Sequence, residues 1–206
     1  MSTIEPQNAL LAVLAYQDLC VAEALLRASA SIDDLDERLQ IGRVAGEALT
    51  RCNQACDEIP GGQAAALAAM KPITSPIDEF WTMTRPRVLV EQYLRVLAVS
   101  VFELELAQRS DLELAEVGLW RAIDHGAGRV HQAITEHQRS VDELSLYARR
   151  LVGEVAVMAQ RLIVRQEALR AALTGQPDDE LDASGAVLDD VLASVAARLG
   201  QLGLSV

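Results

Sequence analysis

The chain has 206 residues, of which half are apolar and only 3% are aromatic, and its formal net charge at pH 7 is −12. This length is enough for one domain with a full core. With so few aromatic residues, the core must consist of leucine, valine, isoleucine and alanine, which favours close-packed helices over sheets. The negative charge disfavours nucleic acid as the main partner, because proteins that bind phosphates usually present a basic surface.

The sequence shows no pattern typical of membrane insertion or export. It contains no run of about 18 uninterrupted apolar residues that would predict a membrane span. The N-terminal stretch MSTIEPQ lacks the basic and apolar regions of a signal peptide. The three cysteines, Cys20, Cys52 and Cys56, are an odd number and are typical of free thiols in the core of a protein kept in a reducing compartment. We therefore expect a cytoplasmic protein that does not bind a membrane.

The first predicted helix covers residues 8–28 and carries one apolar stripe. Asp18 falls in the middle of this stripe when residues are placed at 100° intervals. A carboxylate on an apolar face requires a paired cation, a hydrogen bond, a metal ion or a position at the edge of the face. By the same count, the ring of Tyr16 points elsewhere and is not its partner.

The second predicted helix begins in the capping cluster of residues 31–34 and reaches residue 58, before a Pro-Gly-Gly turn. Its predicted core face includes Ala45 and Ala48, whereas Glu47, Thr50 and Arg51 are placed on the polar face. A short helix follows over residues 63–70. Residues 71–86, which contain three prolines, are predicted to form a long irregular connection.

The second half of the chain predicts four more segments. A helix over residues 87–107 is apolar on nearly every side and should be central. The next helix, over residues 111–137, has Leu119, Ala122 and Gly126 on its core face. One long amphipathic helix is predicted over residues 141–173. An acidic loop, DDELDAS, then leads to an amphipathic helix over residues 186–202, which must pack on its own bundle or on a partner.

Three stretches of this chain resemble proteins of the ferritin-like superfamily: LLAVLAYQDL at 10–19, SPIDEF at 75–80 and YARRLVGEVAVMAQRL at 147–162. The order of elements over residues 8–173 is also similar. The resemblance is closest to the actinobacterial ferritin-like proteins related to the tRNA hydroxylase that acts on a modified adenosine. It implies an all-α fold, a ferritin-like four-helix bundle with additional C-terminal helices. Residues 1–206 would form one domain, with the bundle and a long accessory helix in 8–173, and the acidic loop and last helix in 174–206.

The resemblance also implies a di-iron site, with one carboxylate from each of two helices and a Glu-x-x-His from each of the other two. Asp18 matches the first carboxylate. Glu47 and Thr50 have the Glu-x-x-His spacing, but they face outward and the histidine is missing. On the third bundle helix, Glu103 and Glu105 are the nearest carboxylates, and neither lies at the centre of the apolar face. We treat Asp18, Glu47 and Glu103 as vestigial candidates.

The histidines complete this comparison. Only His125, His131 and His137 are present, and none has an acidic residue three or four positions away. The core-facing positions where ligands would stand hold Ala45 and Ala48 instead. The sequence therefore predicts a vacated site, with no catalytic, cofactor-binding or metal-binding residues.

Three hypotheses about function follow. The first, which we favour, is a non-catalytic ferritin-like protein that acts as a binding or assembly module and forms a homodimer or binds a protein partner. The alternative is a di-iron oxidoreductase of the tRNA-hydroxylase type, with iron held by an atypical, carboxylate-rich site that includes Asp18; whether the protein is an enzyme is open. The third is a protein that binds a small apolar ligand in the space left by Ala45, Ala48, Ala122 and Gly126.

Overall fold

The computed structural model describes residues 5–83, 85–110, 116–136, 139–174 and 181–206, and the part of the chain described contains helices and no strands. The elements, in chain order, are α1 (Pro6–Ser29), α2 (Leu35–Glu58), α3 (Gly62–Met70), α4 (Thr74–Met83), α5 (Leu89–Arg109), α6 (Glu116–Thr135), α7 (Val141–Arg165), α8 (Glu167–Thr174) and α9 (Leu181–Gly200). The predicted all-α architecture, a helical bundle with additional C-terminal helices, is confirmed.

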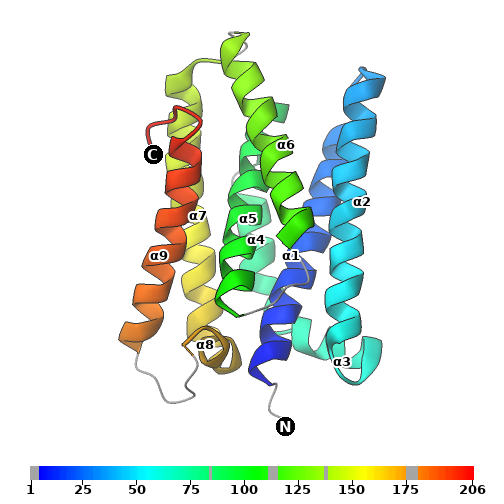
Figure 1. Ribbon diagram of the computed structural model, residues 1–206, viewed down its shortest axis with the longest axis vertical. Coiled ribbons are helices and arrows are strands. Elements are labelled where there is room, and N and C mark those ends of the chain that lie inside the picture. The colour runs from blue at the N-terminus through cyan, green and yellow to red at the C-terminus, as the bar shows by residue number, and fades with distance from the viewer. Residues whose placement is uncertain (1–4, 84, 111–115, 137–138, 175–180) are drawn as a thin grey trace.

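The bundle consists of two helical hairpins, α1 with α2 and α5 with α6, packed against each other (Figure 1). Helix α1 contacts α5, and α2 contacts α6. Helices α3 and α4 make the connection between the two hairpins. Helices α7 and α9 pack on α5 from the side opposite α2, so α5 is surrounded and lies at the centre, as predicted from its apolar composition.

The prediction of an irregular connection over residues 71–86 is wrong, because Thr74–Met83 form α4. Pro76 occupies the third position of this helix, where a missing N–H costs little since the first-turn amides have no helical partner. The helix is held in place by burying Ile77 and Phe80, which are 0% and 1% exposed.

The single helix predicted over residues 141–173 is in fact two helices. At Gln166 the backbone is extended, with φ −124° and ψ 94°, and α8 begins at the next residue. The break lets Leu169 bury its side chain, and α8 packs against α1. Arg170 donates from Nη1 to the carbonyls of Ile163 (3.3 Å) and Val164 (3.4 Å) in the last turn of α7, which satisfies acceptors that the break exposes.

The last helix, α9, packs on its own bundle. Leu188, Val191, Val195 and Leu199 are buried, and the helix contacts α5 and α7. It begins at residue 181, earlier than predicted, so the last part of the predicted acidic loop is helical. The preceding part of that loop lies outside the described residues.

The small residues on α6 serve close helix packing. A Cβ added at Gly126 would lie 3.3 Å from Leu97 Cβ and 3.3 Å from the Tyr93 carbonyl oxygen. Ala122 is also buried. At Gly126, the space that the sequence suggested for an apolar ligand is therefore filled by α5.

Within the described residues, α1 alone is long and apolar enough to cross a membrane, but 72% of its most apolar stretch is buried inside the bundle. A core helix meets the same criterion, and α1 carries a buried aspartate at its centre. The packing of α1 is that of a core helix.

Candidate functional site

A buried ion pair joins α1 to α2 in the interior of the bundle. Asp18 is 3% exposed and Arg51 is 6% exposed. Arg51 Nε donates to both carboxylate oxygens of Asp18 at 3.1 Å, and Arg51 Nη2 donates to Asp18 Oδ1. This two-pronged geometry is the strongest form of a guanidinium–carboxylate contact. The cation that the apolar surroundings of Asp18 required is therefore Arg51.

The prediction that Arg51 lies on the polar face of its helix is wrong. Arg51 follows Ala48 by three residues, so its Cα lies at the edge of the core face rather than opposite it. A long arginine side chain can reach inward from such an edge. The Arg51 side chain turns inward because the buried Asp18 carboxylate on α1 attracts it. This contact depends on the packing of α1 on α2, which the sequence of α2 alone does not show.

A second carboxyl group, that of Glu103 on α5, belongs to the same cluster. Its side chain is 0% exposed, and neither of its oxygens forms a hydrogen bond with any residue that the structure describes. The sequence placed Glu103 off the centre of the apolar face, but the side chain is fully buried, because α5 contacts α1, α6, α7 and α9. Arg51 Nη1 is also buried without an acceptor.

Burial determines the charges of this cluster. Burial raises the pKa of Asp18 to about 6, although Arg51 acts to lower it. Burial and the nearby Asp18 carboxylate raise the pKa of Glu103 well above its ordinary value. Burial lowers the pKa of Arg51, but the charge and hydrogen bonds of Asp18, together with the nearby Glu103 and Glu47, raise it by more, so the guanidinium stays charged. Near neutral pH the cluster contains one anion, one cation and one protonated carboxylic acid.

The other candidate residues are not bonded to this cluster. Glu47 forms an ion pair with Arg121 (Arg121 Nη1 to Glu47 Oε1, 3.0 Å) on the outside of the bundle. His125 is half-buried with its ring edge-on to Tyr93, at 5.4 Å between centroids. Burial lowers the pKa of His125, which keeps it neutral. His131 is exposed, and His137 lies outside the described residues.

These residues do not fit a di-iron centre. Such a centre needs several carboxylates and imidazoles around a shared position. Among the described residues, no three His, Cys, Asp or Glu side chains are grouped closely enough to hold a metal ion. Both oxygens of Asp18 already accept hydrogen bonds from Arg51, and that charged guanidinium would repel a metal cation at the same position. In this arrangement the Asp18 carboxylate faces the Arg51 guanidinium and is not open to a metal ion.

Sequence reasoning found Asp18 and named Glu103, but it missed the role of Arg51. The available signal was indirect: a carboxylate in the middle of an apolar stripe demands a cation, and Arg51 is a basic residue next to the core face of the neighbouring helix.

Comparison with known proteins identifies the fold family but no protein of known activity. No curated protein matches the chain. A family model described as a ferritin-like domain of actinomycetes matches residues 7–176, which include α1 to α8 and the whole buried cluster. Since the match covers most of the chain, this protein belongs to the actinomycete family of ferritin-like domains.

Proposed function

We propose that this protein is a non-catalytic member of its family, in which a buried arginine stands where family members related to the tRNA hydroxylase would hold metal, and that it acts as a binding or assembly module. The observation that carries the proposal is the two-pronged contact of Arg51 with Asp18 beside the fully buried Glu103. A fixed guanidinium supplies the positive charge that buried carboxylates need, so Asp18 can stay buried in the bundle without a metal ion.

The three free cysteines agree with an intracellular role that does not depend on thiol chemistry. Cys52 is buried, and Cys20 and Cys56 are half-buried. Burial raises the pKa of the Cys52 thiol to about 12, so a reactive thiolate is scarce at neutral pH. We place the protein in the cytoplasm, where such thiols stay reduced.

The competing function is a di-iron oxidoreductase that uses Asp18 and Glu103 as metal ligands. Elemental analysis of protein purified from iron-supplemented cells separates the two. We expect iron in the wild type to equal that in an Asp18→Asn variant, at background level. Near-stoichiometric iron that is lost in Asp18→Asn but retained in a Glu47→Gln control would overturn the non-catalytic proposal, because Glu47 lies outside the cluster.

We also propose that the partner of the module is a second copy of the chain or another protein. Helix α9 does not need a partner, because it packs on its own bundle. Exposed leucines gather instead on the outer side of α2, where Leu35, Leu39 and Leu49 are 67%, 53% and 37% exposed. Sedimentation velocity of the wild type and of a Leu35→Gln, Leu39→Gln variant tests self-association: a monomer at all concentrations rules out the homodimer.

A further inference from the structure

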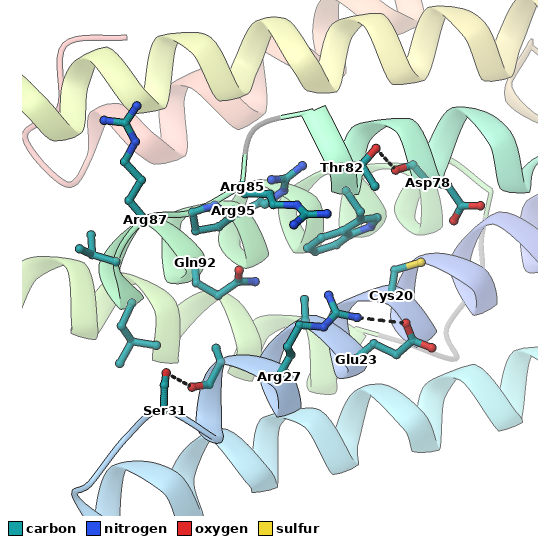
Figure 2. A pocket seen from close by; sticks show the side chains of 16 residues that line it. Cys20, Glu23, Arg27, Ser31, Asp78, Thr82, Arg85, Arg87, Gln92 and Arg95 are labelled. Atoms are coloured by element: carbon teal, nitrogen blue, oxygen red, sulfur yellow. Dashed lines mark hydrogen bonds and ion pairs between the residues drawn. The ribbon is translucent and has the colours of Figure 1, made fainter.

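A large cavity opens between α1, α4, α5 and the segment that precedes α5, and none of the Asp18, Arg51 and Glu103 side chains lines it (Figure 2). Its volume is about 820 Å³, which is within the range of small-molecule sites. Apolar residues, among them Ala24, Ala28 and Leu89, share its lining with Trp81 and a set of charged groups. The cavity can therefore hold a molecule with both apolar and charged parts.

The charged groups of the lining are mostly basic. Four arginines, Arg27, Arg85, Arg87 and Arg95, line the cavity against two carboxylates, Glu23 and Asp78. Figure 2 shows Arg87 directed away from the cavity. Both carboxylates have partners: Glu23 lies 3.9 Å from Arg27, and Asp78 accepts a hydrogen bond from Tyr16 at 2.7 Å. In a chain with a net charge of −12, this is a local excess of positive charge.

Two polar groups of the lining have no partner in the described part of the protein. Arg85 forms no ion pair there, and Gln92, which is 7% exposed, buries its Nε2 without an acceptor. Figure 2 shows the Gln92 amide extending from α5 toward the space beside α1. A buried amide without an acceptor is costly to maintain unless something else accepts its hydrogen bond. The two ends of an amide have nearly the same shape, so a half-turn of the Gln92 amide would present its NH2 group to a ligand oxygen in the cavity.

The wall of the cavity is rigid at Trp81. The indole Nε1 donates to Gln17 Oε1 at 3.0 Å, and Gln17 Nε2 in turn donates to the sulfur of Met158 at 3.1 Å. The guanidinium of Arg95 lies 5.2 Å from the Trp81 ring centroid and 4.5 Å from that of Phe80. These contacts tie α4 to α1, α5 and α7, so the aromatic surface is held in place before any ligand arrives.

We propose that this cavity binds a small organic anion, with an apolar body against Trp81 and a carboxylate or phosphate group bound by Arg27, Arg85 and the amide of Gln92. The proposal goes beyond the binding role suggested above, because it names a small-molecule ligand class and uses a different part of the molecule. Iron analysis reports on the Asp18 cluster alone, so either proposal can fail while the other stands.

The test uses a matched pair of fluorescent probes, anilinonaphthalene sulfonate and its uncharged counterpart N-phenyl-1-naphthylamine. A Trp120→Phe background leaves Trp81 as the sole tryptophan, because the chain has two. We expect the sulfonate to bind, to quench Trp81, and to bind about tenfold more weakly in each of Arg27→Gln, Arg85→Gln and Gln92→Met. The same substitutions should leave the neutral probe within about twofold. Arg43→Gln, an exposed arginine on α2, is the control for general charge effects.

Several outcomes would overturn the proposal. They are equal binding of the two probes, sulfonate binding without quenching of Trp81, or no loss in the three cavity variants when their circular dichroism shows them to be folded. Gln92→Met removes a buried donor that has no acceptor, so it should fold at least as well as the wild type.

Displacement of the sulfonate then identifies the anionic group. Displacement by benzoate supports a carboxylate ligand, and displacement by phenyl phosphate supports a phosphate ligand. If benzyl alcohol displaces the probe as well as either anion, or if neither anion displaces it, the cavity does not select organic anions.

Discussion

Replacing Arg51 by methionine tests whether the ion pair supports the bundle. Methionine keeps an unbranched chain in place of the aliphatic part of Arg51, but it leaves Asp18, which is 3% exposed, without its cation. Removing one partner of a buried pair costs about 3–5 kcal/mol. Even with Arg51 present, burial raises the pKa of Asp18 from 3.8 to about 6, which corresponds to about 3 kcal/mol of unfavourable charge burial. We therefore expect Arg51→Met to lower the free energy of unfolding by about 3–5 kcal/mol near pH 8.

The pH dependence of this loss has a definite sign. The folded state binds the Asp18 proton more tightly than the unfolded state, so the contribution of Asp18 to stability is most favourable below pH 3.8 and is lost as the pH rises through about 6. Arg51 acts to lower the folded-state pKa of Asp18, so in its absence this pKa is higher and stability is lost up to a higher pH. The Arg51→Met variant should then lose less stability near pH 5 than near pH 8.

Urea unfolding followed by circular dichroism at both pH values measures these differences. Asp18→Asn combined with Arg51→Met should recover a large part of the loss, because no buried charge is left unpaired. Arg43→Met, at an exposed position of the same helix, should stay within about 0.5 kcal/mol of the wild type. The reasoning is refuted if Arg51→Met loses equal stability at both pH values, or if the double variant loses the sum of the two single losses.

Two further predictions concern Glu103 on α5 and the glycines of α6. Glu103→Gln resembles the protonated acid, so its free energy of unfolding should stay within about 1 kcal/mol of the wild type near pH 5 and exceed the wild type toward pH 8. A loss that grows with pH in the same urea titrations would contradict a raised pKa for Glu103. Gly126→Val should cost about 1–3 kcal/mol through its contact with α5, whereas Gly128→Ala, with nothing within 4 Å of its added Cβ, should gain up to about 1 kcal/mol. Thermal melts that rank these two variants in the opposite order would disprove the close packing of α6 on α5.

Local sequence signals located most of the helices. The Asp34 cap accepts from the amides of Asp36 and Glu37, and the Ser140 cap from that of Glu143, so the starts of α2 and α7 could be predicted. The apolar stripe around Asp18 also showed that this carboxylate is unusual. Such features depend on residues within one or two turns, which the sequence presents directly.

Contacts between helices decided the rest. The break at Gln166 follows from the burial of Leu169, and α4 from the burial of Ile77 and Phe80, in each case against residues distant in sequence. Arg51 lies at the edge of its helix face, and only the packing of α1 on α2 turns it inward, onto Asp18. Sequence periodicity reports which side of a helix is apolar. The direction of a long side chain at the border of that side depends on which charge the neighbouring helix buries, and this is a property of the tertiary structure.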